Sequence, residues 1–284
     1  MAILIDLNQV LISNLMQQIH SDPKMKLDEN LIRHMVLNSL RSYIKQFKSK
    51  YGEIIIACDS KKYWRRDYFP FYKSNRKKDR EKSDLDWTLI FETLNKIRDE
   101  LKEYFPYKVI DVEGAEADDI IGVLTPRLAS GSEVLILSSD KDFVQLQKYR
   151  NVTQYSPILK KFIQVDDPKQ YVKEHILKGD RGDGIPNFLS PDNVFALGGR
   201  QKSINTKKLN EWLNQNPEDF CTNDTLLRGY KRNQMLVDLD YIPETIKSAI
   251  VETYDNAKSG SKQKLMNYFI EKRLRNLIEV LDEF

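Results

Sequence analysis

The stretch Val134–Asp142, with the sequence VLILSSDKD, decides the fold class of this chain. Four apolar residues in a row are typical of a strand buried on both faces, and the polar residues behind them are typical of a turn into a helix. Similar apolar runs at 2–7, 54–58 and 107–112 alternate with helical patterns. Strands that alternate with helices predict an α/β fold, with a central, mostly parallel sheet flanked by helices.

Acidic residues stand where the predicted strands end. Asp6 and Asp59 each end an apolar run, and an Asp-x-Asp pair follows Ser139. Two further clusters lie at the start of the helix predicted over 115–128 and in the polar turn 179–184. Because ligands gather at the carboxyl ends of parallel strands, we expect these acids to face one another. The full set is Asp6, Asp59, Glu116, Asp118, Asp119, Asp140, Asp142, Asp180 and Asp183.

The chemistry of this set points to a divalent cation. Crowded carboxylates repel one another unless cations lie between them. Oxygen ligands without His or Cys among them suit Mg²⁺ or Mn²⁺. His20, His34 and His175 do not neighbour the acids in the sequence, so we expect surface or core roles for them. The pattern predicts a magnesium-dependent enzyme that acts on phosphate.

Each acidic motif also has a structural interpretation. Acids at 116–119 would favour the positive end of a helix dipole. Ser139 or Asp140 would cap the next helix, and Asp with Gly is ordinary in a turn such as 179–184. The prediction of a metal site therefore rests on the conjunction of all five positions.

A basic stretch interrupts the α/β pattern at residues 60–85, which we call the basic arm. Between 61 and 82 it holds ten Lys and Arg residues against three acids, together with several aromatic residues. Cationic side chains hold phosphates, and aromatic rings stack on unpaired bases. The arm therefore predicts contact with a nucleic-acid end or single-stranded segment. The alternative is a solvated charged loop.

Length and composition set the outer bounds. The chain has 284 residues and 40% hydrophobic content, enough for one large domain or two unequal ones. Two cysteines are too few for a disulfide framework, and Cys58 is expected to be a small buried residue. Neither a signal peptide nor an apolar run of membrane-spanning length is visible, so we expect a cytoplasmic protein. The sequence holds neither a phosphate-binding GxxxxGK[ST] loop nor a GxSxG motif.

The character of the chain changes after about residue 166. A hairpin predicted from 152–156 and 161–165 is the last strand pattern. Helices are predicted at 168–178, 204–214, 218–238, 243–257 and 262–282. We therefore predict an α/β domain over 1–166, which includes the basic arm, and a helical C-terminal domain over 167–284.

These motifs resemble the flap endonuclease / 5′-nuclease family, most closely its branch of ribonuclease H enzymes from T-even bacteriophages. The resemblance covers almost the whole chain, and the order and spacing of the motifs make it specific. It implies a PIN-like 5′-nuclease fold. The segments that carry it are Leu4–Asp6, Cys58–Asp59, Tyr63–Asp67, Glu116–Asp119, Ser138–Phe143 and Leu177–Asp180.

The resemblance implies a metal-dependent nuclease with 5′-to-3′ polarity. It would remove RNA primers and adjoining DNA during lagging-strand replication, and would cut flap or forked DNA. Two Mg²⁺ ions, for which Mn²⁺ can substitute, would assist the hydrolysis. An alternative is a structural DNA-binding replication protein without catalysis, which would leave the acids unexplained. A toxin-type ribonuclease would be shorter and would lack the arm.

The resemblance also assigns roles to residues. Asp6, Asp59, Glu116 and Asp118 would surround the first metal ion, with Asp118 essential for catalysis and Asp119 as a direct or supporting ligand. Asp140, Asp142 and Asp183 would hold the second ion, supported by Asp180. In the arm, Lys73 and Arg76 would contact the scissile phosphate, and Arg65, Arg66, Lys77 and Lys78 would contact the nucleic acid.

One departure from the family lies after Gly184, where many members carry a helix-hairpin-helix with Gly-x-Gly. Here Gly198-Gly199 comes late and in a different spacing, so the motif is degenerate and a bound potassium ion is not carried over. Expected partners are an RNA–DNA hybrid or flap or forked DNA, a single-strand-binding protein and a sliding clamp. We expect a monomer in the cytoplasm, which for a phage-encoded protein is that of the host cell. The terminal Leu281–Phe284 would either hook into a clamp or pack on the body.

Overall fold

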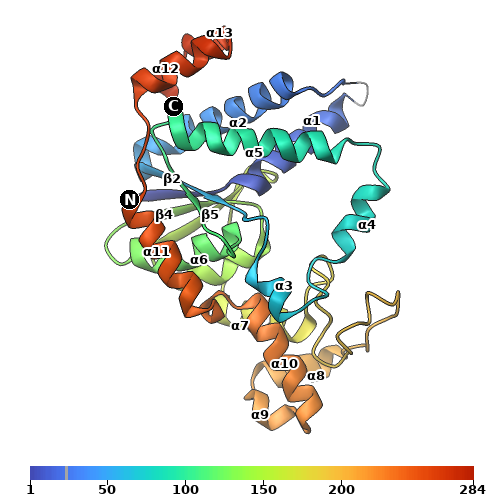
Figure 1. Cartoon of the computed structure of the whole chain (residues 1–284). Coiled ribbons are helices and arrows are strands. Elements are labelled where there is room, and N and C mark those ends of the chain that lie inside the picture. Colours follow the sequence, from blue (N-terminus) through green and yellow to red (C-terminus); the bar gives the residue numbers. More distant parts are fainter. Residues whose placement is uncertain (23–24) are drawn as a thin grey trace.

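A single sheet forms the centre of the protein, whose structure is a computed structural model that describes residues 1–22 and 25–284, without the side chains of 77–79. The strands lie in the order β3-β2-β1-β4-β5-β6. Figure 1 shows the sheet in the middle of the molecule, with helices on both sides of it. Neighbouring strands pair in parallel, except that β6 runs antiparallel to β5 at the edge. The prediction of a mostly parallel sheet with an edge hairpin is confirmed. The strands are β1 (Ala2–Asp6), β2 (Glu53–Cys58), β3 (Lys108–Asp111), β4 (Val134–Leu137), β5 (Val152–Ser156) and β6 (Lys161–Ile163).

Helices cover both faces of the sheet and enclose two hydrophobic cores. Successive residues of β1 point to opposite faces, so Ile3 and Ile5 enter one core while Ala2 and Leu4 enter the other. The first core is closed by α1 (Leu7–Ser21), α2 (Glu29–Tyr51) and α5 (Trp87–Tyr104). The second is closed by α6 (Ala117–Ala129) and α11 (Glu244–Asn256).

The strand order creates a switch point beside β1. The chain passes from β1 to β2 and β3 on one side and then returns to place β4 on the other side. The connections after β1 and β4 therefore diverge at the carboxyl end of the sheet, where α/β folds bind their ligands. Asp6 ends β1, and Asp140 follows β4.

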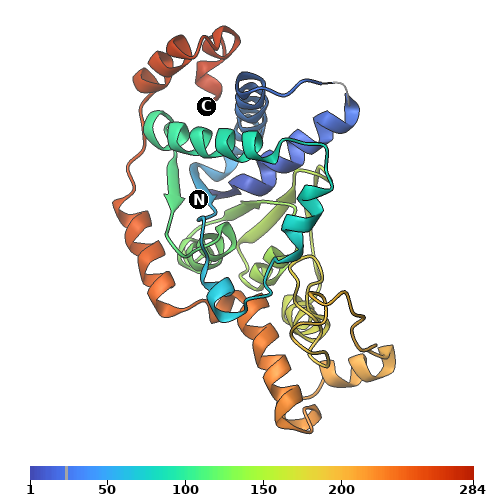
Figure 2. The same ribbon diagram turned by 45° about the vertical axis from the view of Figure 1, so that its right-hand side comes forward.

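The basic arm leaves the sheet after β2. It contains two short helices, α3 (Trp64–Tyr68) and α4 (Asn75–Glu81), and leads into α5 (Figure 2). Phe69 and Tyr72, near the base of the arm, enter a third hydrophobic core with residues of the C-terminal helices. This packing fixes the base of the arm against the helical region.

The second half of the chain is helical, as predicted, with differences in detail. The helix predicted over 218–238 is broken at Cys221–Asn223, where the Asn223 side chain caps the second part. The helix predicted over 262–282 is interrupted at Arg273, whose φ of 55° is outside the helical region. The elements are η1 (Lys141–Lys148), α7 (Pro168–Lys178), α8 (Thr206–Leu213), α9 (Pro217–Phe220), α10 (Asp224–Val237), η2 (Leu239–Tyr241), α12 (Lys262–Glu271), α13 (Arg275–Ile278) and η3 (Leu281–Glu283).

The end of the chain packs on the body. Phe284 is 2% exposed, and its ring contacts those of Phe105 and Phe269 edge to face. The interpretation of this end as a hook for a clamp is wrong for this conformation, because the side chain that the hook needs is buried. The domain boundary at 166 stays a prediction. Contacts of α11 with α6 and of α12 with α5 join the later helices to the sheet region.

Candidate active site

Four acids lie at the carboxyl end of the sheet, and we call them the sheet-edge acids: Asp6, Asp59, Asp118 and Asp140. Asp6 is 5% exposed. Its oxygens accept hydrogen bonds from the Gln9 backbone nitrogen at 3.1 Å and from Ser138 Oγ at 3.1 Å. Burial, together with the charges of Asp59 and Asp140, raises the pKa of Asp6 to about 7. The hydrogen bonds from Gln9 and Ser138 lower the pKa of Asp6, but by less than burial and the two neighbouring charges raise it.

Asp59 contacts the start of α6, the helix whose first turn carries Asp118. Asp59 Oδ1 accepts a hydrogen bond from the backbone nitrogen of Ala117 at 2.8 Å, and its Oδ2 accepts one from Asn8 Nδ2 at 2.8 Å. Burial and the charges of Asp140 and Asp6 raise the pKa of Asp118 well above its usual range, although Lys73 lowers it. The charges of Asp6, Asp118 and Asp140 therefore repel one another without a matching number of cations from the chain.

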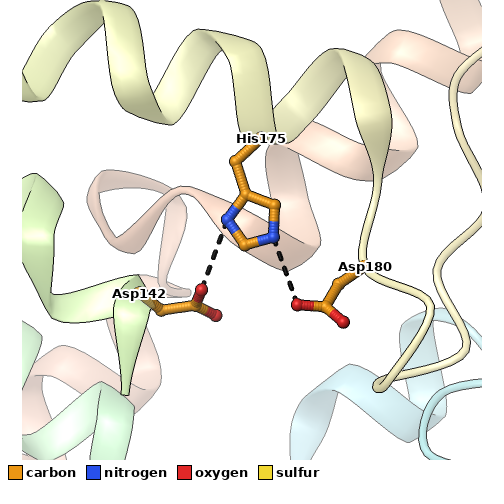
Figure 3. Close-up of side chains that lie close together, drawn as sticks. All are labelled: Asp142, His175 and Asp180. Atoms are coloured by element: carbon orange, nitrogen blue, oxygen red, sulfur yellow. Dashed lines mark hydrogen bonds and ion pairs between the residues drawn. The ribbon is translucent and has the colours of Figure 1, made fainter. Parts of the chain in front are cut away.

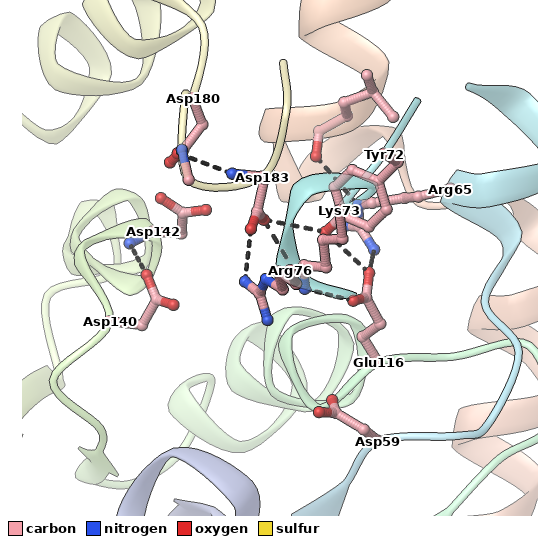
Figure 4. Close-up of polar contacts among 12 residues, drawn as sticks. Asp59, Arg65, Tyr72, Lys73, Arg76, Glu116, Asp140, Asp142, Asp180 and Asp183 are labelled. Carbon is pink, nitrogen blue, oxygen red and sulfur yellow. Dashed lines mark hydrogen bonds and ion pairs between the residues drawn. The ribbon is translucent and has the colours of Figure 1, made fainter. Parts of the chain in front are cut away.

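Glu116 and Asp183, which we call the arm-facing acids, are in the opposite situation. Lys73 Nζ lies 2.6 Å from Glu116 Oε1, and Arg76 Nη2 lies 2.5 Å from Asp183 Oδ1 (Figure 4). The Tyr72 hydroxyl is within hydrogen-bonding distance of both acids, 3.1 Å from Glu116 Oε2 and 3.2 Å from Asp183 Oδ2. The arm therefore supplies the counter-charges of both acids.

The backbone holds Lys73 in this place. Its φ of 54° is in the left-handed region, which a lysine adopts only when the surroundings impose it. Its backbone nitrogen donates to the Asp183 carbonyl at 2.7 Å. A Cβ on Gly184 would lie 2.8 Å from the Phe71 carbonyl oxygen, so the close contact between arm and turn requires glycine here. Burial lowers the pKa of Lys73, but Glu116 and Asp183 raise it above its ordinary value.

The remaining acids surround His175 on α7. Its Nδ1 lies 3.3 Å from Asp142 Oδ1, and its Nε2 lies 3.2 Å from Asp180 Oδ2 (Figure 3). Asp140 caps η1 by accepting a hydrogen bond from the Asp142 backbone nitrogen at 2.9 Å. The expectation that His175 lies away from the acids is wrong, because the fold brings α7 beside η1.

The two carboxyl groups beside His175 differ in their pKa. Burial and the neighbouring acids raise the pKa of Asp142 to about 7, in spite of His175, which lowers it. Burial also raises the pKa of Asp180, but His175 and Lys141 hold it well below its usual range. Asp142 is therefore short of positive charge and Asp180 is not.

The residues present fit divalent cations. The sheet-edge acids carry more negative charge than the chain neutralises, and Asp142 Oδ1 is buried without a hydrogen bond from the described residues. Within the described ranges, one group of three potential ligand atoms lies within 4.8 Å of one another, that of Asp142, His175 and Asp180. Hard carboxylate oxygens in excess are the donor set that Mg²⁺ and Mn²⁺ take.

Sequence comparison identifies the family. A family described as "5'-3' exonuclease, N-terminal resolvase-like domain" matches residues 2–176, and one described as "T4 RNase H, C terminal" matches 167–284. Ribonuclease H of Enterobacteria phage T4 is 36% identical over 291 residues, which cover 99% of this chain and 95% of that protein. The chain belongs to the 5′-3′ exonuclease family.

Other members agree with this membership. A 5′-3′ exonuclease of Buchnera aphidicola subsp. Acyrthosiphon pisum is 28% identical over 82% of this chain and 85% of its own length. The flap endonuclease of bacteriophage T5, solved as a pseudo-enzyme-product complex with DNA and metal ions, has the same fold. It has a TM-score of 0.60 and 19% identity over 90% of this chain and 99% of that chain. The predicted 5′-nuclease fold and nuclease activity are confirmed.

Two predicted site residues have different places in this nuclease. Asp119 is fully buried, and its oxygens accept hydrogen bonds from Arg65 Nη1 at 2.7 Å and from Trp64 Nε1 at 3.2 Å. It supports Glu116, whose backbone nitrogen donates to it at 2.9 Å. Of the two predicted roles, direct or supporting ligand, these contacts favour the supporting one, because both oxygens accept hydrogen bonds from the chain.

Arg65 is the second of these residues. It is 2% exposed, it contacts Glu116 and Asp119, and its Nε donates to the Leu236 carbonyl at 3.0 Å. A buried guanidinium with these partners cannot contact nucleic acid, so the prediction of a binding role is wrong. Arg66 is exposed and stacks over Tyr63. The side chains of Lys77 and Lys78 lie outside the described part of the structure.

Sequence reasoning missed three site residues. Tyr72 links the arm-facing acids, Ser138 bonds Asp6, and Asn8 bonds Asp59. The positions of Asn8 and Ser138 directly behind strands were a usable signal.

Over the described residues, no helix is both long enough and apolar enough to cross a membrane.

Proposed function

We propose that the protein hydrolyses phosphodiester bonds in RNA primers and in adjoining flap or forked DNA, with the aid of two Mg²⁺ ions. The observation that carries this proposal is the crowding of un-neutralised carboxylates at the switch point of the sheet, beside a cationic arm. The names of the relatives support the substrate classes, since they include ribonuclease H and flap endonuclease. The metal-bound T5 enzymes support divalent-ion dependence.

The acids divide into two sets of ligands. Asp6, Asp59, Asp118 and Glu116 would hold one ion, and Asp140, Asp142 and Asp183 would hold the other. When bound, such ions activate water and neutralise charge on the reacting phosphate. The raised pKa values of Asp6 and Asp142, both about 7, support an ion at each set, because neither of these two carboxyl groups has a lysine or arginine partner among the described residues. Arg65 and Asp119 would hold Glu116 in place from behind.

The arm would bring positive charge to the substrate. Lys73 and Arg76 form ion pairs with acids of both sets, and a phosphate entering the site would offer these cations an alternative partner. There they would stabilise negative charge that develops on the phosphoryl oxygens. Exposed Arg66, stacked on Tyr63, would contact the nucleic acid beside the site. Contact with a single-strand-binding protein, a monomeric state and a cytoplasmic location remain predictions.

A cleavage assay tests the proposal. A 5′-labelled DNA flap and an RNA–DNA hybrid are incubated with the protein in Mg²⁺, in Mn²⁺ and in EDTA. We expect cleavage of both substrates in Mg²⁺ and Mn²⁺ and none in EDTA. Cleavage that persists in EDTA would contradict the metal assignment. Binding without cleavage under every metal condition would favour the structural DNA-binding alternative.

A further inference from the structure

His175 joins two segments of the site that are far apart in the sequence. It lies in the last turn of α7 and is 7% exposed. The two nitrogens of its ring face different acids, Asp142 on η1 and Asp180 in the turn after α7, at 3.3 and 3.2 Å (Figure 3). An imidazole has nitrogens on two edges, so one ring can span two carboxylates. The two acids are 38 residues apart in the sequence, and the ring of His175 lies within 3.3 Å of both.

The contact with Asp180 is firmly anchored. Asp180 Oδ2 also lies 2.8 Å from Lys141 Nζ, and its Oδ1 accepts hydrogen bonds from the backbone nitrogens of Gly182 at 2.8 Å and Asp183 at 3.2 Å. Its charge and its hydrogen-bonding capacity are therefore largely used by the protein. Asp180 consequently acts as a fixed support for the ring and for the backbone of Asp183, and leaves little capacity for a metal ion.

The contact with Asp142 is different. Asp142 Oδ1 is buried and receives no hydrogen bond from the described residues, and Nδ1 of the His175 ring lies 3.3 Å from it. A ring at this distance restricts the orientations open to the carboxyl group, and so the direction in which its other oxygen can face. Outer partners that orient metal-binding carboxylates in this way typically change metal affinity by about 10- to 100-fold.

These contacts form a continuous chain from one acid to another. His175 contacts Asp142 directly, and it reaches Asp183 through Asp180, which accepts the Asp183 backbone nitrogen. We propose that His175 is a positioning residue that sets Asp142 and Asp183 relative to each other for the second metal ion. This inference rests on the proposed function. It assigns a role to a histidine that the sequence pattern did not connect with the site.

Two substitutions separate the two contacts of the ring. His175→Asn places an amide near the position of Nδ1 and retains a donor toward Asp142, whereas His175→Gln retains one near Nε2 toward Asp180. Flap cleavage is measured across a Mg²⁺ titration, with flap binding measured in EDTA. We expect both variants to need about 10- to 100-fold more Mg²⁺ for half-maximal cleavage. The maximal rate should stay within a few-fold of the original, with flap affinity unchanged.

The matched control is His20→Gln, because His20 is exposed at the end of α1 and is not part of the group that His175 forms with Asp142 and Asp180. It should leave the Mg²⁺ midpoint unchanged. A folded His175 variant with the original midpoint would overturn the inference. So would a folded variant that stays inactive at every Mg²⁺ concentration, since that result indicates direct ligation. Absence of Mg²⁺-dependent cleavage in the unsubstituted protein would instead contradict the proposed function.

Thermal melting in EDTA shows whether the variants fold. If neither His175 variant folds, Lys141→Met provides the test, because Lys141 is 54% exposed and supports Asp180 from the other side. We expect this substitution to raise the Mg²⁺ midpoint in the same direction and by less than the His175 variants. An unchanged midpoint in Lys141→Met would overturn the proposal.

Discussion

The sheet-edge acids and the arm-facing acids belong to one site but are neutralised differently. The protein supplies cations to Glu116 and Asp183, through Lys73, Arg76 and, for Glu116, Arg65. It supplies few to Asp6 and Asp118, and their pKa values are raised. A buried charge is costly unless it is paired. The charged forms of Glu116 and Asp183 are therefore stabilised by cations of the chain, whereas those of Asp6 and Asp118 would be stabilised by a cation from solution.

The two groups also respond differently to a metal ion. An ion beside the sheet-edge acids relieves repulsion that already exists. An ion that uses Glu116 or Asp183 has to compete with Lys73 or Arg76 for the same oxygens. Metal binding at the arm-facing acids would thus be linked to release of Lys73 and Arg76, which are also the cations expected to contact the phosphate.

The largest effect should come from removing a sheet-edge charge. We expect Asp118→Asn to slow flap cleavage by at least about 10³-fold, because metal stabilisation of the transition state is worth several kcal/mol. Flap binding in EDTA should be retained, since a carboxylate does not attract DNA. The control is Asp255→Asn, an exposed acid that pairs with Arg127. Full activity in Asp118→Asn would remove this acid from the metal site.

Stability should respond in opposite directions in the two groups. Glu116→Gln removes one of the two acidic partners of buried Lys73 and of buried Arg65, which keep Asp183 at 3.7 Å and Asp119 at 2.7 Å. We expect a loss of about 3 kcal/mol in the free energy of unfolding, because each cation is left with less negative charge beside it. Asp118→Asn should raise the stability of the metal-free protein, because it removes repulsion. Denaturant unfolding in EDTA measures both, with exposed Glu244→Gln as the control. A similar change for both variants would contradict the comparison.

The arm should affect the rate more than the affinity. We expect Lys73→Ala combined with Arg76→Ala to lower the single-turnover cleavage rate by about 10²-fold, because these cations act on charge that develops in the reaction. Flap affinity should fall by much less. The control pair is Arg127→Ala with Lys247→Ala, which lies outside the arm. Loss of affinity alone would reassign Lys73 and Arg76 to general backbone binding.

The smallest effect concerns pH. The pKa values of Asp6 and Asp142 are about 7 in the folded protein, against about 4 for an unfolded aspartate. The folded state therefore binds more protons between these values, and the metal-free protein should lose stability as pH rises from about 4 to about 7.

Mg²⁺ should offset this loss above pH 7, where the carboxylates are charged. We expect Mg²⁺ to raise the melting temperature by a few degrees more at pH 8 than at pH 6. Melting curves with and without Mg²⁺ at both pH values check this. An equal shift at the two pH values would show that Asp6 and Asp142 are already charged at pH 6.

The sequence predicted the sheet, the arm and the acids, since their patterns are local. It missed α1, although Asp6 caps that helix and Leu7, Val10 and Leu11 have helical spacing. It could not separate Arg65 from Arg66, because adjacent arginines look alike until packing buries one of them. It separated His175 from the acids, because only the packing of α7 on η1 brings them together.

A crystal soaked in Mn²⁺ tests the central claim most directly, because anomalous scattering locates the ion without reference to activity. The account predicts an ion among the sheet-edge acids, bound by oxygens of Asp118 and of at least one carboxylate from a strand end. Ordered acids with no ion between them, at a Mn²⁺ concentration that supports cleavage, would contradict it.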